Sequence, residues 1–158
     1  MPNAQSESSP NIFTVIIQWL ERNASRLALL IVLLFTLSGI LTLDDYGLAW
    51  DEGLGNIFLG ERYFYYLQNF QQKYLDFKAE LDHHLTLPLN TFVAPMRDFP
   101  HEFPPVMDIT SAASMHLFAY KLNWLPPISA FHLPTVLLAG GFLWLLYRFA
   151  AKRFGKLA

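Results

Sequence analysis

Two long stretches without a charged side chain place the strongest constraint on this chain. The first, Leu27 to Leu43, holds 17 residues, and the second, Leu125 to Tyr147, holds 23. At ~1.5 Å per residue even the shorter stretch forms a helix about 25 Å long, which can cross a thin bilayer. A water-soluble chain of 158 residues has too little other material to cover helices that are apolar on every side. We therefore predict an all-α membrane protein with two transmembrane helices.

The composition supports a membrane protein and excludes several other classes. Charged residues make up 15% of the chain, whereas soluble domains carry about 25%, and hydrophobic residues make up 53%. The chain has no cysteine, which excludes disulfide scaffolds, thiol nucleophiles and cysteine-based metal sites. A net charge of −2 gives no support to a nucleic-acid partner, which a clustered basic face would indicate.

The positions of the basic residues predict how the two helices are oriented. Arg22 and Arg26 precede the first stretch, and four cations follow the second, namely Arg148, Lys152, Arg153 and Lys156. Because cytoplasmic ends of membrane helices are enriched in Lys and Arg, we expect both termini to be cytoplasmic. The segment 44–121 holds 11 acidic and 5 basic residues, and we expect it on the opposite side.

These patterns divide the chain into five predicted parts. They are a cytoplasmic N-terminus with an amphipathic lead-in, a first span, a long extracytoplasmic loop, a second span and a basic cytoplasmic tail, at residues 1–26, 27–43, 44–121, 122–147 and 148–158.

The predicted loop contains two segments with the spacing of amphipathic helices. Leu54 to Phe77 is rich in aromatic residues at helical intervals, and Ile109 to Trp124 repeats the pattern before the second span. Such helices lie either on the membrane surface, which the aromatic content favours, or inside a small extracytoplasmic domain.

Asp51 and Glu52 are the first candidates for chemistry. They follow the predicted first span by eight residues, which places them close to the bilayer surface. A carboxylate there is partly desolvated, so it can serve as a general base on a substrate hydroxyl or as a ligand for a divalent cation. The plainer alternative, which spacing alone favours, is an exposed acidic turn.

Further candidates lie later in the loop. His101 and Glu102 can hydrogen-bond a phosphate or a sugar, or join a metal site with Asp51. Arg62 can meet a lipid phosphate, although ordinary surface charge explains it equally simply. His83 and His84 motivate a weaker hypothesis, a metal-binding loop of a transporter.

The order of these motifs resembles the start of the membrane-embedded GT-C glycosyltransferases of the family 39 type. This family includes protein O-mannosyltransferases and the aminoarabinose transferases of lipid A. The matching pieces are Trp50-Asp51-Glu52 beyond the first span, the helix from Leu54 to Phe77, and the stretch His101-Glu102-Phe103-Pro104-Pro105. The last is a looser version of the family's His-Pro-Pro element, and family members have many more spans than two.

The resemblance implies sugar transfer from a polyprenyl-phosphate donor to an acceptor, with inversion. Asp51 corresponds to the catalytic base, Glu52 supports it or helps to bind a metal, and His101 and Glu102 contact the donor with Arg62. We expect an N-terminal fragment, a truncated product or one part of a split enzyme, inactive without further spans and located in the bacterial inner membrane. The alternative is a non-enzymatic protein with two spans whose acidic outer loop binds a partner.

Overall fold

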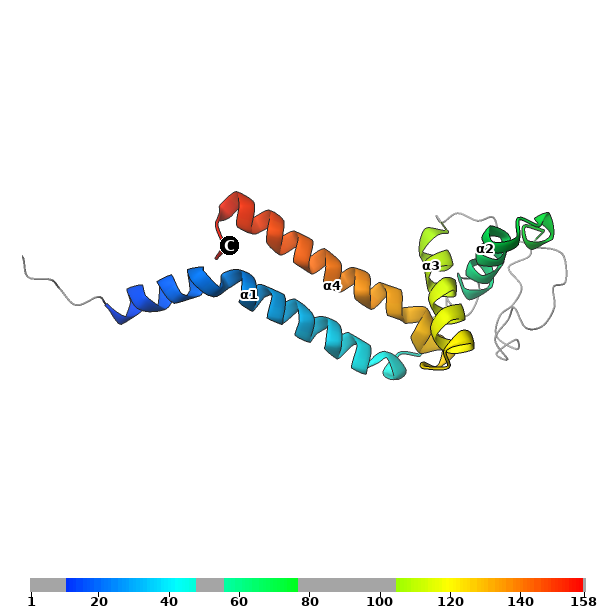
Figure 1. The fold of residues 1–158 in the computed structure, drawn as a ribbon, viewed down its shortest axis with the longest axis horizontal. Helices are drawn as coiled ribbons and strands as arrows, with labels where there is room; N and C mark the ends of the chain where they lie inside the picture. The colour runs from blue at the N-terminus through cyan, green and yellow to red at the C-terminus, as the bar shows by residue number, and fades with distance from the viewer. Residues whose placement is uncertain (1–10, 48–55, 77–104, 158) are drawn as a thin grey trace, which may run out of the picture. The chain divides into compact units, whose positions relative to one another are not determined.

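The computed structural model describes residues 11–47, 56–76 and 105–157, and every regular element in these ranges is helical (Figure 1). In chain order the elements are α1 (Ile12–Leu41), the short 3-10 helix η1 (Leu43–Asp45), α2 (Ile57–Asn69), the short 3-10 helix η3 (Gln72–Tyr74), α3 (Val106–Ser114), the π-helix η5 (Met115–Lys121) and α4 (Pro127–Phe154).

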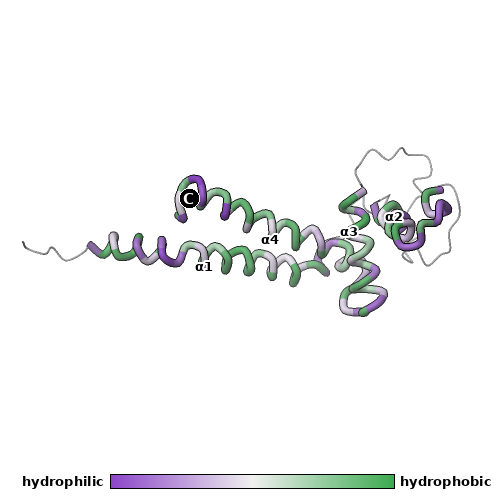
Figure 2. Tube along the Cα trace, turned by 45° about the horizontal axis from the view of Figure 1, so that its top comes forward, coloured by the Kyte–Doolittle hydropathy of each residue, from purple (hydrophilic) through white to green (hydrophobic). Residues whose placement is uncertain are grey.

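Helices α1 and α4 are both long and apolar enough to span a membrane. They hold 30 and 28 residues, and apolar residues follow most of their length (Figure 2). Large apolar side chains on both helices lie open to the surroundings, such as Ile31 and Leu145, each 66% exposed. Water would oppose this exposure, whereas lipid tails favour it. The described part of the chain thus contains two candidate membrane-spanning helices.

The predicted lead-in and first span form one continuous helix. Asn11 begins α1, because its side-chain Oδ1 accepts a hydrogen bond from the Phe13 backbone N–H at 3.2 Å. No proline or glycine occurs in the helix before Gly39, so nothing in the sequence interrupts it. Helix α1 therefore begins well before the predicted span.

Helix α4 extends beyond the predicted second span at its C-terminal end. It starts at Pro127, in agreement with the expectation that the two prolines at 126 and 127 suit a first turn. It ends at Phe154, where Gly155 takes a left-handed conformation with φ of 102°. The cations Lys152 and Arg153 lie in this last turn, where they favour the helix dipole.

The two helices of the loop region are shorter or less regular than predicted. Helix α2 ends at Asn69, since Phe70 adopts a left-handed conformation with φ of 53° and its N–H bonds back to the Tyr66 carbonyl. Helix α3 changes to π-helical hydrogen bonding at Met115, and Asn123, also at φ 53°, follows the end of that segment.

The described residues form two compact units. The first unit comprises residues 1–36 with 139–158, and the second comprises 37–138. In the first, a Cβ added to Gly140 would overlap the Thr36 hydroxyl, so α1 and α4 approach closely there.

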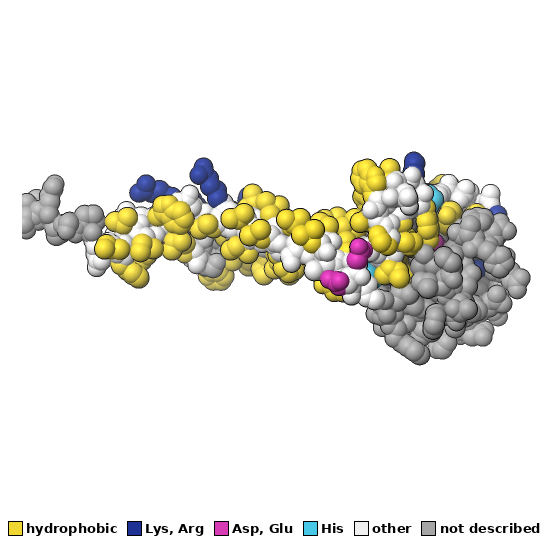
Figure 3. All heavy atoms as spheres, turned by 90° about the horizontal axis from the view of Figure 1, so that it is seen from below, with side chains coloured by type: hydrophobic (Ala, Val, Ile, Leu, Met, Phe, Trp, Pro, Cys, Tyr) yellow, Lys and Arg dark blue, Asp and Glu magenta, His cyan; other side chains and the backbone are white. Residues whose placement is uncertain are grey.

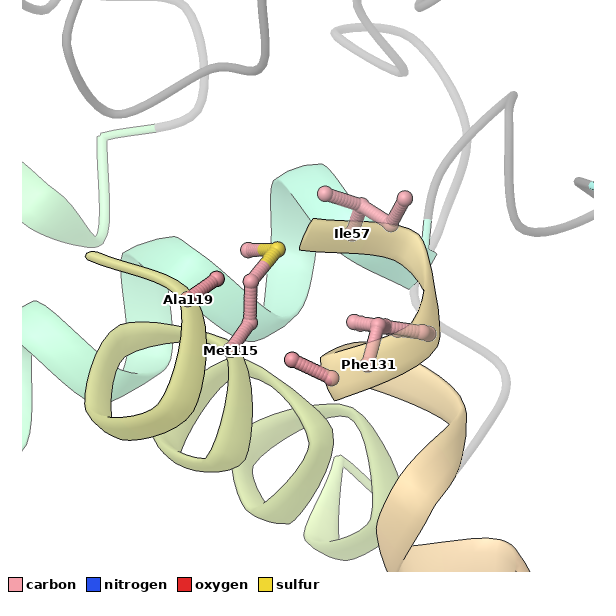
Figure 4. Packing of buried hydrophobic residues seen from close by; sticks show 5 residues of the cluster. Ile57, Met115, Ala119 and Phe131 are labelled. Atoms are coloured by element: carbon pink, nitrogen blue, oxygen red, sulfur yellow. The ribbon is translucent and has the colours of Figure 1, made fainter. Parts of the chain in front are cut away.

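The second unit contains a small apolar core. The side chains of Ile57, Met115 and Phe131 converge there with Ala119 and Ala130, and the first two are almost fully buried (Figure 4). The members come from α2, η5 and α4, so the core joins the loop region to the first turns of the second long helix.

Candidate functional site

The chain leaves α1 through the 3-10 turn η1, which is held against the start of α4. Leu43 is buried, and the buried Ser129 hydroxyl donates a hydrogen bond to Oδ1 of Asp44 at 2.5 Å. The ring of Tyr46 lies 6.2 Å from that of His132. These contacts fix where the loop begins relative to the first turns of α4.

Four of the predicted site residues lie outside the described residues. They are Asp51, Glu52, His101 and Glu102, and the histidines at 83 and 84 lie outside as well. Their roles remain predictions. On either side of the first pair the described chain ends at Gly47 and resumes at Asn56.

Arg62 is the predicted site residue that the structure describes. It lies on α2, only 2% exposed, and its guanidinium sits 4.7 Å from the centre of the Phe58 ring. The Nη1 atom donates a hydrogen bond to the backbone carbonyl of Asp76. Arg62 thus joins α2 to the segment after η3, and its contact with a phosphate stays a prediction.

Glu61 is a buried carboxyl that the sequence analysis did not single out. It is 3% exposed, and its Oε2 atom has no hydrogen-bond partner among the described residues. Burial raises its pKa from 4.5 to about 9, because the charged form loses its hydration. At neutral pH the group is therefore a neutral carboxylic acid, which can donate a hydrogen bond but cannot serve as a base.

Aromatic rings from three elements gather near this carboxyl. The His116 ring lies 5.3 Å from Phe64, 5.9 Å from Tyr65 and 6.4 Å from Tyr120, centre to centre. Tyr74 of η3 stacks on Tyr65 at 5.8 Å. The Nδ1 atom of His116 is buried without a hydrogen-bond partner among the described residues. The cluster thus combines ring faces with two polar atoms whose hydrogen-bonding capacity is unused.

Glu61 also acts on its phenolic neighbours. Burial raises the pKa of Tyr65 and of Tyr120, and the negative charge that Glu61 carries at alkaline pH raises both further. The Tyr120 hydroxyl lies 3.9 Å from the Met115 sulfur. All three ionisable groups are therefore neutral at physiological pH.

His116 and Tyr120 lie on the π-helical segment Met115–Lys121. Its hydrogen bonding is visible where the Leu122 N–H bonds to the carbonyl of Leu117, five residues earlier, at 2.9 Å. The hydroxyl of Ser114, just before the segment, donates to the Ala130 carbonyl at 2.7 Å. Segments of π-helix are rare and often occur at functional sites, so this one marks the cluster around Glu61 as a candidate.

Helices α2 and α3 meet backbone to backbone beside this cluster. A Cβ added to Gly60 would overlap the carbonyl oxygen of Asp108 and would lie 3.3 Å from the Ala112 methyl. Asp108 is partly buried, and burial raises its pKa from 3.8 to about 6. Only glycine permits this approach, which brings Glu61, the next residue, into the interior.

The described residues contain no group of three or more His, Asp or Glu side chains that could hold a metal ion. The metal predicted at Asp51 and Glu52 concerns residues outside that description. A signal for the buried carboxyl was present in the sequence. Ile57, Gly60 and Glu61 have the i, i+3, i+4 spacing of one helix face, and an apolar residue with a glycine marks the inner face.

Comparison with known proteins adds no relative. No protein-family model matches the chain, and neither a curated protein nor a solved structure matches it. The family resemblance therefore rests on the order and spacing of its motifs.

Proposed function

We propose that the chain is the N-terminal module of an integral-membrane glycosyltransferase. The complete enzyme moves a sugar from a polyprenyl-phosphate donor to an acceptor hydroxyl or amine, with inversion. Asp51 is the base that takes the acceptor proton, and Glu52 supports it or shares a divalent metal with it. Further membrane spans complete the site, as the resemblance implies.

The contact between η1 and the start of α4 is the observation that carries this proposal. Asp51 follows Tyr46 by five residues, so the covalent chain limits the distance between their Cα atoms to about 18 Å. Tyr46 is held near His132, close to the points where both long helices begin or end. This tether supports a position for the acidic pair at the membrane boundary.

A donor anchored in lipid suits such a position. Its polyprenyl chain stays in the bilayer, and its phosphate and sugar lie at the surface beside the carboxylates. No nucleotide-binding motif is then required, and the sequence contains none. His101, Glu102 and Arg62 are the donor contacts in this proposal.

The region around Glu61 serves as the support for the site in this proposal. A neutral buried carboxyl, a buried guanidinium and close packing at Gly60 hold α2 against α3 and η5. Catalytic groups need rigid neighbours to stay in productive geometry. The second unit supplies such neighbours on the chain segments that flank both predicted motifs.

The test uses the complete protein, including any continuation of its reading frame, in membranes with a synthetic polyprenyl-phosphate sugar. Asp51→Asn should lower the transfer rate at least about 100-fold, because the acceptor proton loses its base. Asp45→Asn is the matched control, since Asp45 lies six residues earlier and is exposed. The control should transfer sugar at the rate of the unchanged protein.

Two results would overturn the proposal. One is unchanged transfer by Asp51→Asn. The other is the absence of transfer by the unchanged complete protein with every lipid-linked donor offered, which would favour the non-enzymatic alternative. Transfer by the 158-residue chain alone would contradict the expectation that further spans are needed.

A further inference from the structure

We propose that the first unit binds the headgroup of an anionic phospholipid between the charged ends of α1 and α4. The site consists of Arg22 and Arg26 on α1 together with Arg148 and Lys152 on α4, and we refer to these four residues as the basic collar. This inference does not depend on the proposed transferase activity.

Charge in the first unit is strongly one-sided. Its described residues carry a single acidic side chain, Glu21, against the four cations of the basic collar and the neighbouring Arg153 and Lys156. All six cations are exposed, and none forms an ion pair with a carboxylate of the described residues. Figure 3 shows dark-blue Lys and Arg side chains gathered on one face of this part of the helices, without a magenta side chain beside them.

The two helices are joined in the middle of the basic collar. The hydroxyls of Ser25 and Tyr147 share a hydrogen bond of 3.1 Å. Arg26 and Arg148 directly follow these two residues, so the cations of both helices flank one inter-helix contact. The collar is thus a single two-helix feature rather than two separate helix ends.

Within each helix the paired cations are four residues apart, which places them on the same face. Like charges at this spacing destabilise a helix by about 0.2–0.5 kcal/mol per pair. Arg22 with Arg26 and Arg148 with Lys152 both carry this cost without a described acid to relieve it. A phosphate between the helices would relieve both repulsions, since Lys and Arg bind phosphate oxygens through charge-assisted hydrogen bonds.

The surroundings of the basic collar indicate a lipid rather than a soluble phosphate. Phe149 and Leu145 lie within one turn of Arg148 and are both 66% exposed, so apolar surface adjoins the charges. Trp144 stacks on Tyr147 at 5.6 Å, and the Arg148 guanidinium lies 5.9 Å from the Trp144 ring. Amphipathic aromatic rings of this kind are typical of the membrane interface. A phospholipid satisfies both surfaces, its tails against the apolar residues and its phosphate against the cations.

The test measures lipid binding by the detergent-solubilised chain with native mass spectrometry. Phosphatidylglycerol should bind in preference to phosphatidylcholine. The double variants R22Q/R26Q and R148Q/K152Q should each weaken phosphatidylglycerol binding about 10- to 30-fold, at ~1 kcal/mol for each cation near an anionic headgroup. The control K73Q/K121Q removes two cations of the second unit and should bind like the unchanged chain.

Further arms keep the result interpretable. R22K/R26K retains the charges and should retain binding, which separates loss of charge from a folding defect. Equal binding of the two lipids would overturn the proposal, and so would equal weakening by K73Q/K121Q. Competition by soluble glycerol phosphate at the concentrations at which phosphatidylglycerol binds would assign the collar to free phosphate and also overturn it.

Discussion

The two units join their helices in different ways. In the first, α1 and α4 meet through Gly140 against Thr36 and through the hydrogen bond between Ser25 and Tyr147. Small residues and isolated hydroxyl contacts are typical of helices that associate in lipid, where burying apolar side chains brings little gain. The first unit therefore resembles two neighbouring membrane helices more than a folded core.

The second unit buries polar groups instead. Glu61, Arg62 and three serines are almost completely enclosed, and two of the serines donate hydrogen bonds across elements. A buried polar group costs free energy unless it has a partner or becomes neutral. The difference teaches that the second unit is the part of the described chain whose interior is specified residue by residue, which is what a functional site requires.

The largest expected effect breaks the close approach in the second unit. Gly60→Ala places a Cβ against the backbone carbonyl of Asp108, which cannot rotate away. We expect the free energy of unfolding to fall by about 3 kcal/mol, as in strongly overpacked interiors. Titration with SDS in mixed micelles, followed by tryptophan fluorescence, measures this change.

Gly140→Ala and Gly141→Ala are the matched controls in the first unit. The first meets the rotatable Thr36 hydroxyl, and the second meets no atom within 4 Å. Their effects should decrease in that order and stay below that of Gly60→Ala. If Gly140→Ala destabilises more than Gly60→Ala, the contrast between the two units is wrong.

The second prediction concerns the pH dependence that Glu61 gives to stability. Because burial raises its pKa from 4.5 to about 9, the folded state retains a proton that the unfolded state has lost between these values. Stability should therefore be greatest at low pH and fall as pH rises towards 9, by at most about 1.4 kcal/mol per pH unit. Thermal unfolding midpoints measured between about pH 7 and 8.5 test this slope.

Two variants separate Glu61 from Asp108. Glu61→Gln keeps a neutral side chain of similar shape and should flatten the slope. Asp108→Asn should leave it intact, because the pKa of Asp108 is raised only to about 6 and its contribution ends below this window. A slope that survives in Glu61→Gln would show that another group produces it.

The smallest expected effect belongs to the first unit. Tyr147→Phe removes the hydrogen bond to Ser25, which joins two groups of low burial, so we expect a loss of about 0.5–1 kcal/mol. The double variant with Ser25→Ala should cost little more than either single change, because both remove the same interaction. Additive losses in this cycle would contradict a direct bond between the two hydroxyls.

The long helices could be predicted from the sequence, but their ends could not. An uncharged stretch reports the apolar part of a helix and does not report its continuation into charged residues. Helix α1 continues back to Ile12, through Glu21 and Arg22, because these residues are good helix formers at exposed positions. The orientation of both helices remains a prediction from charge alone.

Prediction reached less of the candidate site, for a different reason. Periodicity assigns Glu61 and Arg62 to a solvated face, since charged residues are rarely buried. Their burial depends on Gly60 and on Asp108, which is distant in sequence, and a pattern within one helix does not contain that contact. The same holds for the π-helical segment, because Met115–Lys121 has no composition that distinguishes it from an ordinary amphipathic helix.

The hydrogen bond from Ser129 to Asp44 spans 85 residues of sequence, and this span has an evolutionary consequence. Closing a flexible segment costs entropy that grows only with the logarithm of its length, so doubling that length costs about 0.6 kcal/mol. Insertions between the two partners can thus accumulate at small cost while both feet of the segment keep the same footing. Descendants of this gene can diversify what they recognise without rebuilding the doorway through which the chain emerges.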